Sequence, residues 1–166
     1  MPFDGAPSAW QARKLARTKA RQAERCAKVL AAREDPVVFS EYCGRLDNGK
    51  YEAVLEEAHK EWHGLWSDHD GAVILAPVGT AKTWNIRYRL IWEMGRDPTV
   101  GIAYLSATQA HPKKQLGAIK SEIETNQRIH QVFPHLKRAT GEREVWSATE
   151  ILIERDTTRP DVTLQC

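Results

Sequence analysis

The residues best suited to chemistry lie in one stretch, residues 71–84, which reads GAVILAPVGTAKTW. Its apolar run at 72–76 is typical of a strand buried on both faces. The run breaks into a short loop of proline, glycine and small residues, and then Lys82 and Thr83 precede a segment with helical character. Strand, tight loop, Lys-Thr and helix together predict a phosphate-binding loop. The start of a helix has unpaired amide N–H groups and partial positive charge, so it favours an anion.

Each residue of this loop has an expected role. Lys82 is expected to contact the β- and γ-phosphates of ATP, and the Thr83 hydroxyl is expected to ligate a magnesium ion. The predicted nucleotide-binding residues are Val78, Gly79, Thr80, Ala81, Lys82 and Thr83. The loop departs from the pattern G-x-x-x-x-G-K-[ST], because Ala76 and Ala81 stand at the two glycine positions. A Cβ atom at Ala81 penalises a positive φ and crowds a phosphate. The alternative is an ordinary strand-to-helix turn with an exposed lysine.

A set of strands and helices would have to position the loop. Further apolar runs at 100–105 and 149–155 predict two more strands, and helical spacing predicts helices at 84–93 and 112–132. This alternation predicts an α/β fold, a partial three-layer P-loop NTPase sheet of the ASCE type with an N-terminal helical extension. Ser106 and Thr108 follow the second strand, at the edge where such sheets bind ligands. They would either approach the phosphates or cap the next helix.

The charge distribution divides the chain into parts. Residues 1–35 contain eight basic and four acidic residues, whereas the whole chain has a net charge of only +2. Ser8 predicts the cap of a helix running from Ala9 to about Ala32, and Asp35-Pro36 predicts the start of the next helix. The expected domains are a basic helical arm at 1–35, a helical lead-in at 36–70 and an incomplete P-loop ATPase core at 71–166. The arm is either a solvated helix or a contact for DNA or another partner.

Other constellations carry weaker signals. His59 and His63 share one face of a helix predicted at 51–66, but a zincin helix needs glutamate directly after the first histidine and Lys60 stands there. Exposed histidines are therefore the favoured interpretation. Residues 151–156 could be a strand ending in a magnesium-binding acid, Asp156, although an ordinary solvated strand end is favoured. The three cysteines are widely spaced and suit a reducing cytoplasm, and no run of 18 apolar residues predicts a membrane span.

From about His59 to Pro160 the chain resembles the amino-terminal part of a phage terminase large subunit, an ATP-driven DNA-packaging motor. The resemblance lies in an ordered series of matches: His59 and Trp62, residues 76–83, Asp97-Pro98, residues 102–108, Ile123, Asn126, residues 133–136, Trp146 and residues 151–155. It implies that Lys82 and Thr83 contact phosphate and magnesium, and that Gly79, Thr80 and Ala81 supply loop backbone. Val78 is a departure, because the family often has arginine at that position. The family's acidic magnesium-binding strand, catalytic glutamate, coupling motif and nuclease domain have no convincing equivalent before Cys166.

The resemblance implies a function. The chain is expected to be the N-terminal segment of a terminase-like DNA-packaging ATPase that binds ATP and Mg²⁺ and hydrolyses ATP poorly on its own, and no catalytic residue is assigned. The implied partners are double-stranded DNA, the portal and the small terminase subunit, in the cytoplasm of a bacterial host and without a membrane. The alternative is a small, complete nucleotide-binding or regulatory module that is not a motor.

Overall fold

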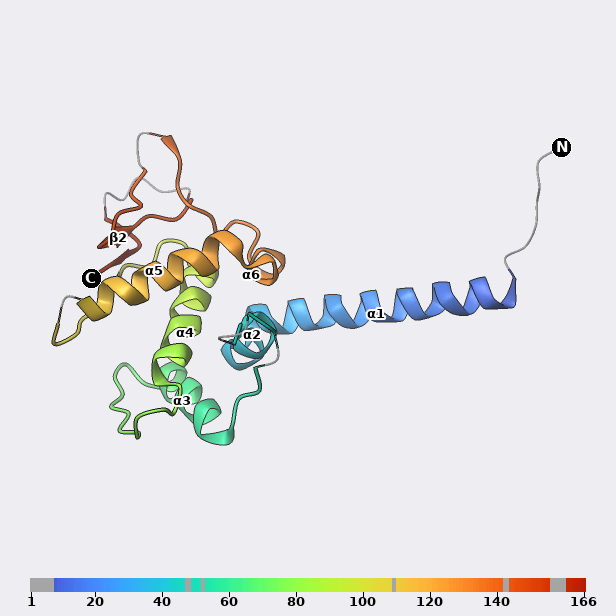
Figure 1. Cartoon of the computed structure of the whole chain (residues 1–166), viewed down its shortest axis with the longest axis horizontal. Helices are drawn as coiled ribbons and strands as arrows, with labels where there is room; N and C mark the ends of the chain where they lie inside the picture. Colours follow the sequence, from blue (N-terminus) through green and yellow to red (C-terminus); the bar gives the residue numbers. More distant parts are fainter. Residues whose placement is uncertain (1–7, 47–48, 52, 109, 142–143, 156–160) are drawn as a thin grey trace.

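The computed structural model describes residues 8–46, 49–51, 53–108, 110–141, 144–155 and 161–166. These residues form six α-helices and one small sheet. The helices are α1 (Ala9–Glu34), α2 (Pro36–Cys43), α3 (Glu57–Asp68), α4 (Lys82–Arg96), α5 (Ala110–Thr125) and α6 (Gln127–Val132). Helix α1 extends away from the rest of the molecule, while α4 and α5 lie in its centre (Figure 1).

The capping signals in the sequence correctly predicted two helix starts. The Ser8 hydroxyl accepts a hydrogen bond from the Gln11 amide at the start of α1, and the Asp35 carboxylate accepts from the amides of Val37 and Val38 at the start of α2. The single helix predicted at 112–132 is instead two helices. Asn126 breaks it, because its side-chain oxygen caps the first amides of α6. The helix predicted to begin at Tyr51 begins only at Glu57.

The predicted P-loop NTPase sheet is wrong. The described residues form three strands of two residues each, β1 (Ile102–Ala103), β2 (Glu150–Ile151) and β3 (Leu164–Gln165). The strand order is β1-β3-β2, with β3 parallel to β1 and antiparallel to β2. The fold is mostly helical with a minimal mixed sheet, not a three-layer α/β sheet.

The apolar run at 72–76, expected to be the central buried strand, is irregular and open to solvent. The side chains of Val73 and Leu75 are 86% and 93% exposed. A strand is stable only when neighbouring strands pair with its backbone N–H and C=O groups. In this structure β1 pairs with β3, and no described strand pairs with residues 72–76. The apolar pattern alone therefore did not predict burial, because the strand β3 that could have paired with this run pairs with β1 instead.

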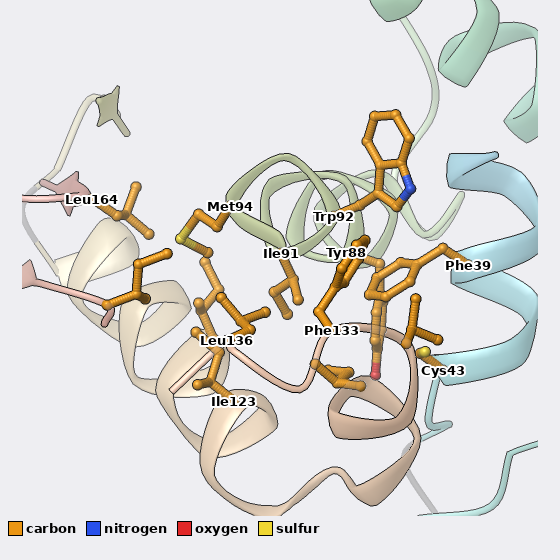
Figure 2. Close-up of a cluster of buried hydrophobic side chains, with 14 of the residues drawn as sticks. Phe39, Cys43, Tyr88, Ile91, Trp92, Met94, Ile123, Phe133, Leu136 and Leu164 are labelled. Atoms are coloured by element: carbon orange, nitrogen blue, oxygen red, sulfur yellow. The ribbon is translucent and has the colours of Figure 1, made fainter. Parts of the chain in front are cut away.

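Helices supply most of the hydrophobic core. Helix α4 runs through it and contributes Tyr88, Ile91, Trp92 and Met94, which pack against residues from α2, α5 and α6 (Figure 2). Leu164 joins the cluster from β3. The indole N–H of Trp92 donates a hydrogen bond to the carbonyl of Ala32 at 3.1 Å, which fixes the end of α1 to this core. Helix α4 is therefore rigidly held, and its first turn carries the Lys82-Thr83 pair.

Candidate functional site

The loop from Ala76 to Thr83 folds back on itself around the ammonium group of Lys82. The Lys82 Nζ donates hydrogen bonds to the carbonyl oxygens of Ala76, at 2.6 Å, and Pro77. A third, longer contact of 3.4 Å reaches the Thr80 hydroxyl, which itself donates to the Pro77 carbonyl at 2.9 Å. The backbone thus wraps a positive charge at the beginning of α4.

Ala81 has the backbone geometry that the glycine of a phosphate-binding loop would adopt. Its φ and ψ are 53° and 21°, in the left-handed region, and it is the N-cap of α4. Gly79, two residues earlier, also has a positive φ, of 89°. No side chain caps the first turn of α4, where the first intrahelical bond runs from the Asn85 amide to the Ala81 carbonyl. The amides before Asn85 are therefore the orphan donors of a helix start, at the end with partial positive charge.

Two side chains hold this loop in place. His59 lies at the start of α3, and its Nε2 atom is 3.2 Å from the carbonyl oxygen of Thr80. The Nδ1 atom of the same ring accepts a hydrogen bond from the Glu56 amide. Because Nδ1 accepts, the proton lies on Nε2, which donates to Thr80. On the other side, the Asn85 side-chain amide donates to the Ala81 carbonyl at 3.1 Å. The loop is consequently tied to both α3 and α4.

The loop forms one wall of a surface cavity of about 1270 Å³. All six predicted nucleotide-binding residues, 78–83, line it. The opposite walls bring three further groups: basic side chains of Arg87 and Lys114, the amide of Gln115, and an apolar section of Leu46, Val54, Leu55 and Trp84. The described lining residues include three cations and no carboxylate, so the cavity favours an anionic ligand.

Arg87 occupies an unusual position in this cavity. One of its terminal nitrogens donates to the Gln115 side chain at 3.0 Å, which links α4 to α5. Its Nε atom is buried and has no hydrogen-bond partner among the described residues. A buried donor on a charged group is costly to leave unpaired. Arg87 therefore carries one buried, unpaired N–H in addition to the terminal nitrogen that contacts Gln115.

His63 lies fully buried behind the loop, on the core side of α3. Burial, together with the positive charge of Arg89, lowers the pKa of His63 to about 4. Neither ring nitrogen makes a hydrogen bond of good geometry with a described residue, although the nearby Asn85 side chain partly opposes the lowering of the pKa of His63. The Arg89 guanidinium donates to the His63 carbonyl at 3.1 Å. His63 is thus a neutral core residue, which corrects the interpretation of both histidines as exposed. His59 is partly buried against the loop.

The other predicted site residues do not join this cavity. Ser106 and Thr108 are exposed in the segment between β1 and α5 and are not among the residues that line it. Asp156 lies outside the described residues. Within the described ranges, no cluster of three or more histidine, cysteine, aspartate or glutamate side chains has the arrangement of a metal site.

Sequence reasoning missed Arg87, Lys114 and Gln115. Arg87 lies four residues after Thr83 on the same helix, so helical spacing could have placed both on one face. Lys114 and Gln115 gave no such signal, because they approach the loop only through the packing of α5 beside α4.

Magnesium fits this lining poorly as a resident ion. Protein sites for Mg²⁺ usually supply one or two carboxylates, whereas the described lining offers the hydroxyls of Thr80 and Thr83 and no carboxylate. Thr83 alone could assist an ion that nucleotide phosphates already hold.

Comparisons with protein-family models, with curated proteins and with solved structures found no match. None of the helices that the structure describes is both long and apolar enough to cross a membrane.

Proposed function

We propose that this chain binds the phosphate groups of a nucleotide in the cavity beside the Ala76–Thr83 loop. The observation that carries the proposal is that Lys82, Arg87 and Lys114 line one cavity together with the start of α4, and that the described lining of this cavity has no carboxylate. Each cation comes from a different part of the chain or a different turn of helix. Their convergence creates a positive site that a polyphosphate would neutralise.

The backbone supports the same ligand. A left-handed residue followed by helical residues turns successive N–H groups toward one point and forms an anion-binding nest. Ala81 and the first turn of α4 have this conformation. The helix-start amides would bind phosphate oxygens in the way that backbone groups of phosphate-binding loops do.

Lys82 could take up a phosphate oxygen without releasing the loop. An ammonium group has three donors, and two of them are engaged with the Ala76 and Pro77 carbonyls. The third contact, to the Thr80 hydroxyl, is long at 3.4 Å and therefore weak. A phosphate oxygen that replaces it would gain a charge-assisted hydrogen bond while the loop stays wrapped around Nζ.

The apolar part of the cavity supports a nucleotide in preference to inorganic phosphate. Leu46, Val54, Leu55 and Trp84 form a non-polar wall next to the cationic groups. The Trp84 ring is held by a hydrogen bond from its N–H to the Arg45 carbonyl and by contact with Tyr88 at a centroid distance of 4.5 Å. A base could pack on this wall while its phosphates face Lys82.

The proposal is one of binding, not of turnover. Phosphoryl transfer depends on positioned metal ions and a group that orients the attacking water, and the described lining supplies no carboxylate for either task. The implied role in a packaging motor, with its DNA, portal and small-subunit partners, stays a prediction.

Isothermal titration calorimetry with ATP and with inorganic triphosphate tests the proposal. At low salt, we expect Lys82→Ala to weaken ATP binding by at least about tenfold, because it removes a charge-assisted contact to phosphate. Lys114→Ala should weaken binding a few-fold. Repeating the titration in EDTA should reduce affinity only modestly, since the protein contributes few magnesium ligands.

Lys113→Ala is the matched control, because Lys113 is the exposed neighbour of Lys114 on α5 and does not line the cavity. It should leave ATP affinity unchanged. Thermal melts of all three variants establish that the fold is retained. Equal affinity of the wild type and Lys82→Ala for both ligands would refute the proposal, as would an equal loss in Lys113→Ala and Lys114→Ala.

A further inference from the structure

Helix α1 carries a continuous arginine face along most of its length. Arg13, Arg17, Arg21 and Arg25 follow one another at intervals of four residues, which places them on one side of the helix. At 1.5 Å per residue they span about 18 Å. Lys14 and Lys28 fall within the same face, whereas Lys19 lies on the opposite side. Residues 9–28 are all exposed.

This face has little support within the molecule. Helix α1 projects from the body, and only its C-terminal part meets other elements (Figure 1). Among the described residues of this charged face, Lys28 forms an ion pair with Glu24 at 3.0 Å, and both side chains are largely exposed. Like charges four residues apart repel and lower helix stability. A row of four arginines is thus unfavourable for the isolated helix, and a polyanion would relieve the repulsion.

The arginine face continues into the body of the protein. At its C-terminal end, a cavity of about 490 Å³ is lined by the side chains of Arg21, Glu24, Arg25, Lys28, Tyr42 and Arg128. Four of these six residues are cations and one is an acid. The positive surface therefore runs from the exposed helix to a concave site between α1, α2 and α6.

Arg128 is held in place at this cavity. Its guanidinium lies over the rings of Tyr51, at 4.0 Å, and Tyr42, at 5.1 Å, and donates to the Tyr42 carbonyl at 2.7 Å. Arg25 approaches from α1 and donates to the Gln131 side chain at 3.2 Å, and the Tyr42 hydroxyl donates to the same oxygen at 2.7 Å. Arg25 and Arg128, on two different helices, are thus both held by contacts with α2 or α6 where they line this cavity.

We propose that the arginine face of α1, together with Arg128, binds the phosphate backbone of double-stranded DNA without reading its sequence. The inference does not rest on the proposed nucleotide site, which lies on other elements. DNA carries a regular line of phosphate charges that a row of basic side chains can neutralise. The major groove of B-form DNA is about 12 Å wide and admits a helix, whereas the major groove of A-form RNA is deep and narrow.

The remaining surface of α1 favours DNA over a membrane. A helix that lies in a membrane interface has a large apolar face with bulky side chains. Opposite the arginines, α1 has a mixture of alanines and polar residues in which the exposed bulky apolar side chains are Leu15 and Leu30, while the exposed Trp10 lies on the arginine side. That surface has little bulk to insert between lipids.

Fluorescence anisotropy with a labelled 20-base-pair DNA, using the full chain at 50 and 200 mM salt, tests the proposal. The triple variant Arg13→Gln/Arg17→Gln/Arg21→Gln should bind at least tenfold more weakly at 50 mM salt. The logarithm of the binding constant should also fall less steeply with the logarithm of salt, by about 2.7, because each lost phosphate contact removes about 0.9 from the slope. Glutamine forms helices nearly as well as arginine, so circular dichroism should show unchanged helix content.

The matched control is the triple variant Lys19→Gln/Lys113→Gln/Lys137→Gln, which also removes three positive charges. These three lysines are exposed and lie off the arginine face. This variant should bind within about twofold of the wild type. Equal weakening of the two triple variants would overturn the proposal, since it would reduce the effect to net charge. Absence of DNA binding at 50 mM salt, or equal or tighter binding to double-stranded RNA or to anionic vesicles, would also overturn it.

Discussion

The buried imidazole of His63 makes the stability of this protein depend on pH, and the size of the effect follows from its surroundings. Burial and the neighbouring Arg89 lower the pKa of His63 to about 4, against an unperturbed value of about 6.5. Between these values the unfolded chain binds a proton that the folded protein does not. The contribution of His63 to the free energy of unfolding is therefore fully present above about pH 6.5 and is lost as the pH falls toward 4.

The magnitude follows from the two pKa values. At pH 5, His63 would lower the free energy of unfolding by about 2 kcal/mol relative to pH 7.5, and the loss would approach about 3 kcal/mol near pH 4. His63 is 0% exposed, so solvent screens this effect little. Protonation would place a positive charge in a buried site beside Arg89, and the Asn85 side chain and Asp35 would offset only part of this cost.

Urea unfolding followed by tryptophan fluorescence at pH 7.5 and pH 5 measures the effect. We expect the wild type to lose about 2 kcal/mol more than His63→Gln between the two pH values. Other groups that titrate in this range contribute equally to both proteins, so the difference isolates His63. His69→Gln is the matched control, because His69 is exposed directly after α3 and its removal should leave the pH dependence of the wild type intact.

The same data would refute the reasoning if the two proteins lost stability in parallel. Parallel loss would mean that His63 has the same pKa in the folded and unfolded states, and hence that it is hydrated or paired in the folded protein. The comparison requires that the slope m of the unfolding free energy against urea concentration is the same for both proteins. A changed m would instead indicate a change in the unfolded ensemble.

Two further predictions concern backbone geometry and packing. Ala81→Gly should raise the free energy of unfolding by about 0.5 kcal/mol. Glycine adopts the left-handed conformation of residue 81 without the steric cost that alanine has, and this gain slightly outweighs the added flexibility of the unfolded chain. The variant should also bind ATP more tightly, and weaker binding in calorimetry would mean that the loop has another geometry. Gly95→Ala should lower the free energy of unfolding by about 2 kcal/mol, because a Cβ atom there would lie 2.2 Å from the Phe133 ring. Gly117→Ala, on α5, is the control, because a Cβ atom there would meet nothing within 4 Å. This variant should raise the free energy of unfolding by about 1 kcal/mol, since alanine favours a helix more than glycine does. Equal urea midpoints for the two variants would contradict the packing of α4 on Phe133.

The sequence alone predicted the features that depend on near neighbours in the chain. Ser8 and Asp35 predicted helix starts because a capping side chain binds amides two or three residues away. The change from an apolar run to Pro, Gly and Lys-Thr predicted a tight loop that opens a helix, and the structure places α4 directly after that loop. The break at Asn126 follows the same local rule, but the long apolar spacing around it concealed the cap.

Only the tertiary structure decided what the apolar strand patterns became and what surrounds the loop. A run of five apolar residues forms a strand only if other strands pair with it, and here Ile102 and Leu164 pair with each other while the side chains of Val73 and Leu75 stay in solvent. Arg87 and Lys114 reach the loop because α4 and α5 pack side by side, so no spacing in the sequence could bring all three cations together. Local rules set helix starts and turns, whereas pairing and convergence are contacts between distant segments that form only when the whole chain folds.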